Sequence, residues 1–597
     1  MISYSAPLKD MKFVLENIID YNELVKLQPF EDATLDTVEA VLGEAGKFFS
    51  GVIDPLRMSG DREMSVLENG QVRTPEGFKE AYRQYVEGGW NGLASDPEYG
   101  GSGLPFVLAC ATAEMAGSAN VAFSLCPMLT QGAVEAIGVH GTEEQKAKYL
   151  EKVITGEWTG AMCLTEPQAG SDVGALKTKA EPKGDGTYRI TGQKIYITYG
   201  DHDMADNIIH LVLARLPDAP AGTKGISLFI VPKILVNEDG SLGNRNDMRP
   251  VSLEHKLGIH ASPTCVMSYG DNGECVGYLI GEENKGMRCM FTMMNHARLN
   301  VGIQGLSTAE LAYQQAYAYA MERVQGRTGK GENGTIIDHA DVRRMLMLIK
   351  SQTEAARSLC YLNAKAIDIA HHGTEKEERW WAQGLADLLT PLSKAWCTDL
   401  GVEAASLAVQ IHGGMGYIEE TGVAQTLRDA RIAPIYEGTN GIQALDLVGR
   451  KLGQDGGEHW KALFTRIEKL VSALPESGDL GLVAEALGSA LRATRHATDW
   501  MMEERNKNMQ AVAAGATEYL RMVALTVGGY LLAVGAQSAK DGLEDGSADT
   551  EYLKARITMA RFYAEQVLPQ VSALAEQVTS GDESLYAMSN EALAVQA

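Results

Sequence analysis

The sequence predicts an α+β multidomain protein in which a β-domain is flanked by helical domains. Three observations support this prediction. Apolar residues recur at three- and four-residue spacing before residue 158 and again after residue 281, which is typical of helices. Between these points, short runs rich in Ile, Val, Tyr and Thr are bounded by Gly, Asp and Pro, which is typical of strands. The 597 residues are also too many for one hydrophobic core.

Two helical segments precede the β-domain. Residues 1–35 are expected to form an N-terminal extension with one helix, around Met11–Glu23. Residues 36–157 are expected to form an N-terminal α-helical domain, interrupted by the glycine-rich turn Asp96–Gly103. Helical spacing in this region is found in four segments: Thr34–Phe49, Pro75–Gly88, Leu108–Ala116 and Glu143–Thr155.

The middle β-domain is predicted over residues 158–281. Its strand signals are the four runs Tyr188–Ile190, Lys194–Thr198, Ile208–Arg215 and Ile226–Val231. Residues 282–452 are expected to form a C-terminal helical bundle, broken by the glycine-rich loop 326–334. Its helices are expected over Met287–Arg323, Asp338–His371, Glu375–Val409 and Gly441–Gly449. Beyond a linker at Gly453–Gly457, residues 453–597 predict an additional C-terminal helical domain.

Charge and cysteine usage exclude several classes of function. The net charge of −25 argues against nucleic acid and anionic membranes as partners, because both are polyanions. The eight cysteines are scattered without a C-x-x-C pair. This pattern favours free buried thiols in a reducing compartment over a disulfide framework or a metal site, and no metal is expected.

No segment is expected to direct the chain out of the cytoplasm. The first twenty residues include the charged residues Lys9, Asp10, Lys12 and Glu16 and contain no apolar signal-peptide core. The two longest uncharged runs, Met115–Val134 and Met522–Ala539, are too polar for membrane spans and are expected to be buried helices. A cytoplasmic protein without a membrane span is therefore predicted.

Two segments near the β-domain contain groups that can contact a flat ligand. Leu164–Asp172 predicts an exposed turn whose backbone N–H groups and hydroxyls can point at a ligand. Tyr196 and Thr198 lie two residues apart, so they share one face of a predicted strand. Taken alone, each segment fits a plain structural turn or a half-buried strand equally well.

Two further segments lie in the helical bundle. Arg298 and the arginines of Met321–Arg327 have the geometry for bidentate contacts to phosphate, although a lone helical arginine is more often a solvated surface group. Gln410–Gly416 contains a Gly pair that lets backbone approach a phosphate closely. Glu437 follows in a predicted loop, where functional residues are frequent, yet a loop glutamate is also commonly just solvated.

Taken together, these segments resemble the acyl-CoA dehydrogenase family over about residues 40–450. The resemblance is carried by several motifs in the family's order: Pro97–Gly101, Gly141–Lys146, Leu164–Pro167, Gly170–Asp172, Gln410–Gly414 and Ile435–Thr439. The N-terminal extension, Lys256–Ser262, Gly326–Gly329 and the last helical domain resemble the family's larger bacterial branch. That branch includes dehydrogenases of 3-(methylthio)propanoyl-CoA, so the resemblance implies a short acyl-CoA substrate and breakdown of dimethylsulfoniopropionate.

The resemblance implies FAD as cofactor and assigns roles to individual residues. Contacts to the flavin ring are implied for the backbone near Cys163 and for Thr165, Tyr196 and Thr198. Contacts to the FAD pyrophosphate of a neighbouring subunit are implied for Arg323, Gln325, Gln410, Gly413 and Gly414. Such a shared site implies at least a homodimer. Thr439 would contact FAD from the catalytic loop, and contacts to the acyl-CoA are implied for Ser171, Arg298 and Gly438.

The resemblance also implies the reaction. Glu437 would remove the α-proton of the thioester while FAD accepts a hydride from Cβ, and the electrons would pass to an electron-transferring flavoprotein. Some relatives carry the base on a helix, at the position of Ala297 here. No acidic residue lies between Lys285 and Ala309, which leaves Glu437.

This chain departs from the family's usual residues at three positions: Tyr196 replaces Trp, Gly326 replaces Phe, and Gly441 replaces Gln. His412, inside the glycine motif, is expected to be a packed or loop-stabilising residue. Three alternatives compete with the dehydrogenase. An oxidase would pass electrons to O₂, a flavin-binding scaffold would lack the base, and a reduced-flavin monooxygenase would lack the Tyr436–Thr439 loop.

Overall fold

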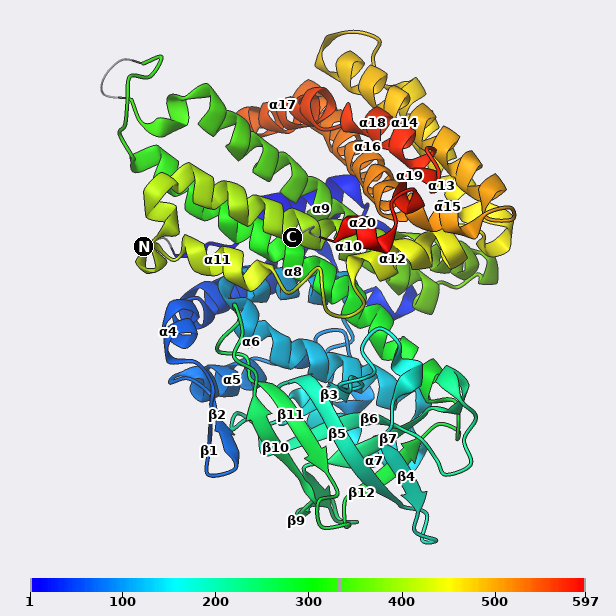
Figure 1. The fold of residues 1–597 in the computed structure, drawn as a ribbon. Coiled ribbons are helices and arrows are strands. Elements are labelled where there is room, and N and C mark those ends of the chain that lie inside the picture. Colours follow the sequence, from blue (N-terminus) through cyan, green and yellow to red (C-terminus); the bar gives the residue numbers. More distant parts are fainter. Residues whose placement is uncertain (1–2, 331–333, 595–597) are drawn as a thin grey trace. The chain divides into compact units, whose positions relative to one another are not determined.

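The computed structural model describes residues 3–330 and 334–594 (Figure 1). The described chain forms two compact units. One comprises residues 3–6 and 43–300, and the other comprises residues 7–42 and 301 onward. Two helices, α3 (Leu35–Phe48) and α8 (Gly286–Glu322), continue from one unit into the other. A mixed helical and sheet architecture was predicted and is confirmed.

The first unit combines helices with an antiparallel sheet. Its helices are α4 (Leu56–Glu63), α5 (Phe78–Glu87), α6 (Phe106–His140) and α7 (Glu143–Thr155). Helix α7 spans the predicted residues because Thr142 and Gln145 form a capping box at its start and Gly156 ends it in a left-handed conformation. Helix α6 packs on strand β3 (Trp158–Cys163), where Thr130 Oγ1 accepts a 3.1 Å hydrogen bond from the Gly160 N–H.

The main sheet has eight strands in the order β10-β11-β5-β12-β7-β6-β3, with β4 paired to β5. These strands are β3 (Trp158–Cys163), β4 (Lys179–Pro182), β5 (Tyr188–Thr198), β6 (Asn207–Ala214), β7 (Ser227–Pro232), β10 (Met248–Leu253), β11 (Thr264–Tyr269) and β12 (Val276–Ile280). A short pair, β8 (Ile234–Val236) and β9 (Leu242–Arg245), completes the domain. Strands β3 and β6 pair in parallel, whereas the other pairs of named strands in the described residues are antiparallel, and side chains of the sheet form one buried apolar cluster.

A hairpin in the N-terminal region was not among the predicted elements. Strands β1 (Val66–Glu68) and β2 (Gln71–Arg73) are joined by Asn69 and Gly70, both with positive φ, as a two-residue turn between strands requires. The Val72 side chain is buried with the sheet's apolar cluster, and its N–H donates to Asp201 Oδ2 at 3.2 Å. These contacts attach the hairpin to the β-domain.

The second unit is helical. Its bundle contains α9 (Ala340–His372), α10 (Lys376–His412), α11 (Val423–Ala430) and α12 (Asn440–Asp446), together with the end of α8. The additional domain contains α13 (Glu458–Ala473), α14 (Gly478–Glu504), α15 (Met509–Ala514), α16 (Ala516–Glu544), α17 (Thr550–Gln566), α18 (Gln570–Val578), α19 (Glu583–Tyr586) and α20 (Asn590–Leu593). Helix α16 is its buried centre and packs on α14, α17 and α18, as well as on α9, α10 and α12 of the bundle.

The N-terminal extension belongs to this helical unit. Instead of one helix over Met11–Glu23, the structure has α1 (Leu8–Phe13), a π-helical turn at Val14–Ile18 and α2 (Asn22–Val25). Phe13 is buried against the C-terminal domain, in a cluster with Ala539 and Leu553. The π-turn therefore lies where the extension packs against distant helices.

Two helices, α6 and α16, are long and apolar enough to cross a membrane, but 83% of the apolar window of each is buried inside the protein. The prediction that these uncharged runs are buried helices is confirmed. All eight cysteines are free and buried, as predicted.

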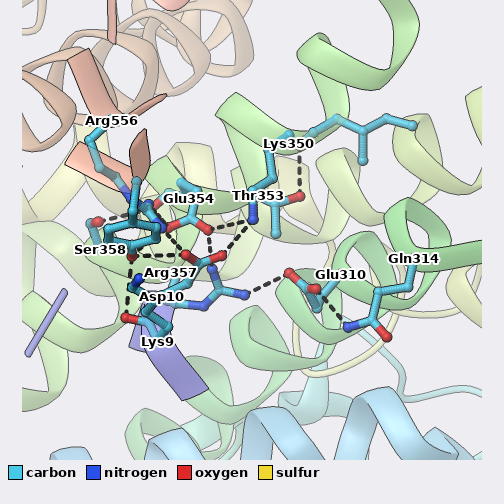
Figure 2. A network of polar contacts seen from close by, with 12 residues as sticks. Lys9, Asp10, Glu310, Gln314, Lys350, Thr353, Glu354, Arg357, Ser358 and Arg556 are labelled. Carbon is cyan, nitrogen blue, oxygen red and sulfur yellow. Dashed lines mark hydrogen bonds and ion pairs between the residues drawn. The ribbon is translucent and has the colours of Figure 1, made fainter. Parts of the chain in front are cut away.

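A buried network of charges ties the extension and the C-terminal domain to the bundle (Figure 2). Arg357 of α9 is fully buried and donates to Glu354 of the same helix and to Glu310 of α8, each at 2.7 Å. Burial opposes ionisation of Glu310, but the charges of Arg357 and Lys350, together with hydrogen bonds from Gln314 and Arg357, outweigh it and lower the pKa of Glu310.

The same network connects the N-terminal extension with the additional C-terminal domain. Arg556 of α17 pairs with Glu354 at 2.8 Å and with Asp10 of α1 (Figure 2). Lys350 of α9 pairs with Asp10 at 2.6 Å and with Glu354 at 3.1 Å. Because every acid in the network contacts a base, the buried charges compensate one another.

Candidate active site

The predicted site residues fall into two groups, one in each unit. The group in the β-domain centres on Tyr196. Between Cys265 and Met267 of β11 the register with β5 shifts, so that Ile195 and Tyr196 both lie opposite Val266. This bulge holds Tyr196 at φ +58, a conformation that a bulky residue rarely adopts. Tyr196 is 60% exposed, so its side chain is accessible to a ligand.

Two threonines, Thr198 and Thr165, were predicted to contact the same ligand as Tyr196. Thr198 is on β5, and Thr165 is joined to the strand by a hydrogen bond from the Ile195 N–H to its carbonyl at 2.9 Å. Both are partly buried, and neither hydroxyl takes part in a hydrogen bond within the described residues. The two threonines therefore lie on strand β5 and on the segment hydrogen-bonded to it, and their hydroxyls remain available to a flat ligand with polar edges.

A buried ion pair supports this group, and sequence reasoning did not identify it as part of the site. Lys194 Nζ donates to Glu166 Oε1 and to the Leu164 carbonyl, both at 2.9 Å. Burial would raise the pKa of Glu166, but Lys194 and hydrogen bonds from Thr178 and Lys177 outweigh it and lower that pKa to about 2. The pair joins the turn after β3 to strand β5 with two charge-assisted contacts. The sequence signal that could have revealed this ion pair is the lysine inside an otherwise apolar strand, because a buried lysine requires a partner.

The remaining residues of this unit differ in exposure. Cys163 is buried in β3 with its Sγ 3.4 Å from His210 Nδ1, and burial raises its thiol pKa to about 12. Its side chain is therefore not available to a ligand, and the contact predicted for the backbone near Cys163 stays a prediction. Ser171 is exposed in the turn after β3. Arg298 on α8 is only 6% exposed.

The group in the helical unit centres on the loop Tyr436–Thr439, which lies between α11 and α12. Glu437 and Gly438 have φ of +56 and +81, so two consecutive residues are left-handed and the chain turns sharply there. The Tyr436 hydroxyl donates to Gln304 Oε1 on α8. Burial raises the pKa of Tyr436 far above its usual value, so it remains a neutral donor.

The other end of this loop is held by α12. Thr439 is the N-cap of that helix, and its Oγ1 accepts a hydrogen bond from the Ile442 N–H at 3.2 Å. Gln443 is fully buried and its Nε2 donates to the carbonyls of Glu437 at 3.3 Å and Gly438 at 3.5 Å. Gln304 and Gln443 were missed from the sequence, because nothing in a lone glutamine signals which carbonyl it will meet.

The predicted pyrophosphate residues lie at the end of α8 and at the end of α10. Arg323 and Gln325 are exposed after α8, with Arg323 Nη2 3.4 Å from Gln325 Oε1. Gln410 lies in the last turn of α10, and Gly413 and Gly414 follow it with exposed backbone and open space around them. Gly413 has φ +59, a conformation that favours glycine.

The C-terminal ends of α8 and α10 lie side by side. The ring of Tyr319, four residues before Arg323, stacks on His412 with 4.3 Å between centroids. His412 is buried, its Nδ1 lies 2.8 Å from the Ala408 carbonyl oxygen, and burial lowers its pKa. The prediction that it is a packed residue is therefore confirmed. The stacked pair brings the exposed arginine and the exposed glycine backbone onto one part of the bundle surface.

The residues fit FAD in two parts. The exposed Tyr196 and the available hydroxyls of Thr165 and Thr198 suit the flavin ring, and an exposed arginine with exposed glycine backbone suits a pyrophosphate. Within residues 3–330 and 334–594, no group of three His, Cys, Asp or Glu side chains could hold a metal ion.

Four family profiles match the chain in sequence order. The N-terminal, middle and C-terminal domains of acyl-CoA dehydrogenase match residues 41–157, 161–271 and 284–452. A profile described as acetyl-CoA dehydrogenase C-terminal like matches residues 463–589. The additional helical domain thus has a counterpart in related proteins.

Full-length relatives have the same architecture. The chain is 46% identical to a 3-methylmercaptopropionyl-CoA dehydrogenase of Ruegeria pomeroyi over 588 residues, covering 98% of this chain and 99% of the relative. It is 35% identical to a butyryl-CoA dehydrogenase of Syntrophomonas wolfei, covering 99% of each. The fold is similar to a crystal structure of acyl-CoA dehydrogenase complexed with FAD from Bacillus anthracis, with a TM-score of 0.75, 21% identity and coverage of 97% and 92%. The chain therefore belongs to the acyl-CoA dehydrogenase family and is an FAD-dependent oxidoreductase that acts on acyl-CoA thioesters.

Proposed function

We propose that Glu437 is the base that removes the α-proton of the acyl-CoA. The observation that supports this is the left-handed turn at Glu437 and Gly438, which three side-chain hydrogen bonds support from both ends of the loop. A strained backbone that its surroundings over-determine is typical of a residue whose position matters for chemistry. When bound, FAD supplies the hydride acceptor for the Cβ hydrogen.

The alternative position for a base supports the same assignment. Ala297 on α8 stands where some relatives carry the acid, and its methyl group is 3% exposed. An apolar side chain there cannot accept a proton, and no acidic residue occurs between Lys285 and Ala309. Glu437 is the carboxylate that remains, which favours a dehydrogenase over a scaffold without a base.

We propose 3-(methylthio)propanoyl-CoA as the substrate and its 2,3-enoyl-CoA as the product. Support comes from the 46% identical relative, whose name specifies this thioester under its older name, 3-methylmercaptopropionyl-CoA. The 35% identical butyryl-CoA dehydrogenase also acts, by its name, on a four-carbon acyl group. Both names describe short acyl chains. The electron acceptor we propose is an electron-transferring flavoprotein.

A panel of thioesters tests the substrate. Anaerobic flavin bleaching should be faster with methylthiopropanoyl-CoA and butanoyl-CoA than with octanoyl-CoA by more than about tenfold, the scale on which a pocket discriminates methylene groups. A preference for the octanoyl thioester would contradict the proposed substrate class. Repeating the turnover in air measures hydrogen peroxide, and release of one peroxide per product would identify an oxidase instead.

The arginine at the end of α8 gives a separate prediction for the cofactor. Arg323→Ala should weaken FAD retention by about tenfold or more, because it removes a charged hydrogen-bond donor from the proposed pyrophosphate contact. Equilibrium dialysis of FAD against apoprotein measures the change. Arg343→Ala, an exposed arginine on α9, is the matched control and should bind FAD like the wild type. Equal FAD affinity in both variants would refute the role of Arg323.

We also propose a homodimer or higher homo-oligomer in the cytoplasm. Large apolar side chains are exposed around the proposed pyrophosphate residues, namely Tyr317, Met321, Val324, Met415, Tyr417 and Ile418. Tyr417 is 87% exposed, an exposure that a neighbouring subunit would reduce. Eight free buried thiols fit a reducing compartment. Light scattering on the purified holoenzyme measures the number of subunits.

A further inference from the structure

We propose that Asn440 is a positioning residue for the base, because its amide is clamped on α10 between a buried cation and a carboxylate. Its Oδ1 accepts from Lys394 Nζ at 2.9 Å, and its Nδ2 donates to Asp399 Oδ1 at 2.8 Å. The Nδ2 group also donates to the Ala395 carbonyl and to Thr398 Oγ1, both at 3.0 Å. Every atom of the amide therefore has a partner on one helix.

The two charges determine which way the amide faces. Lys394 is fully buried and has only donors to offer, so it needs the amide oxygen. An ionised Asp399 has only acceptors, so it needs the amide nitrogen. Rotating the amide by 180° would oppose like groups at both contacts. This gives Asn440 one position, whereas a surface asparagine would have several.

This clamp acts on the base through a short piece of backbone. Asn440 is the first residue of α12 and lies three residues after Glu437. Its own N–H donates to the Pro434 carbonyl at 3.0 Å, which closes the loop on itself. Gln443, one turn further along α12, holds the carbonyls of Glu437 and Gly438. The side chain of Asn440 thus joins the loop to α10, a helix of 37 residues.

The C-terminal domain backs the clamp from the other side. Asp399 lines a pocket of about 60 Å³ between α10, α12 and α16, with Glu403 and with Arg521 of α16. Arg521 pairs with Glu403 at 2.9 Å. Burial raises the pKa of Asp399, and the hydrogen bond from Asn440 opposes this shift. The carboxylate and the amide therefore stabilise each other next to the additional domain.

The inference rests on Glu437 as the proposed base, and a charge-swapped pair of variants tests it. Asn440→Asp places an oxygen against Asp399, which should displace the loop and slow anaerobic flavin bleaching by about 100-fold, the effect expected of a shift near 1 Å. Combining it with Asp399→Asn restores a donor opposite that oxygen at unchanged net charge. The double variant should bleach at least about tenfold faster than Asn440→Asp.

Positioning is distinguished from simple unfolding by two further readouts. The dissociation constant of the thioester, from the perturbed flavin spectrum, should stay within about threefold of wild type, because the clamp acts on a reaction step after binding. Hydrogen exchange in peptides covering residues 436–443 should accelerate in Asn440→Asp and slow again in the double variant. Asn440→Ser removes the side-chain contacts with Lys394 and Asp399 without adding charge, and it should slow bleaching by about tenfold. This variant replaces Asn440→Asp as the test if Asn440→Asp does not fold.

The matched control is Asn508→Asp. Asn508 also stands at the start of a helix, α15, and its Nδ2 donates to a carboxylate, Asp582, at 3.0 Å. Its variant should bleach at the wild-type rate. Bleaching within about threefold of wild type in Asn440→Asp, no recovery in the double variant, or an equal loss in Asn508→Asp would each overturn the positioning role. If none of the thioesters bleached the flavin of the wild type, the proposed function would fail. Hydrogen exchange would still test the positioning role of Asn440 in that case.

Discussion

Replacing Glu437 by glutamine is expected to slow flavin bleaching by about 10⁴-fold or more, the upper end of what a general base contributes. Glutamine is nearly isosteric and keeps the left-handed backbone, the Tyr436 hydrogen bond and the contacts from Gln443. Folding, FAD content and thioester binding should therefore persist. The carboxylate that accepts the α-proton is the group that is lost.

Rapid mixing under anaerobic conditions measures this effect directly. Substrate should perturb the flavin spectrum of Glu437→Gln without bleaching it. Glu485→Gln provides the control, because Glu485 is an exposed glutamate on α14 of the additional domain, and this variant should bleach at the wild-type rate. If Glu437→Gln bleached within about tenfold of wild type, well short of the general-base range, another residue would be the base.

Removing the arginine at the centre of the buried network should have the largest effect on stability. Arg357→Met fills most of the side-chain volume but leaves Glu310, which is 2% exposed, without its paired cation, whereas Glu354 keeps Lys350 and Arg556. Breaking a buried pair from one side costs about 3–5 kcal/mol, because an uncompensated charge remains. The midpoint of urea unfolding should fall accordingly.

The loss of stability caused by Arg357→Met should depend on pH. In the wild type the pKa of Glu310 is lowered, so its contribution to stability is present above its usual pKa and disappears as the pH falls. Without Arg357, burial would raise that pKa, so protonation of Glu310 at lower pH would relieve the buried charge. The destabilisation should therefore be larger at pH 7.5 than at pH 5. Arg344→Met changes an exposed arginine of the same helix and should cost less than about 1 kcal/mol. Equal losses in both variants, or no pH dependence, would contradict this account.

Local signals in the sequence predicted many of the elements. Helix α7 matched its prediction because Thr142, Gln145 and Gly156 define its ends without help from the rest of the chain. Helix α8 was predicted over Met287–Arg323 and lies over Gly286–Glu322, since a long periodic segment leaves little choice. The family and its cofactor were also identified, because their motifs are contiguous stretches of residues.

Elements that depend on distant partners were predicted less well. Two runs, Tyr188–Ile190 and Lys194–Thr198, were expected as separate strands, but neighbours on both sides join them into β5. The bulge that exposes Tyr196 arises from pairing with β11, which the sequence of β5 does not contain. The single helix expected in the extension is broken where it packs on the C-terminal domain.

The sequence by itself determined the family, the kind of chemistry and the residue proposed as the base, because each depends on residue types at short spacing. Only the tertiary structure decided how that base is held. Asn440 lies more than 40 residues from Lys394 and Asp399, and Gln304 lies 132 residues from Tyr436. Hydrogen bonds over such separations form only after helices have packed, so no local pattern encodes them.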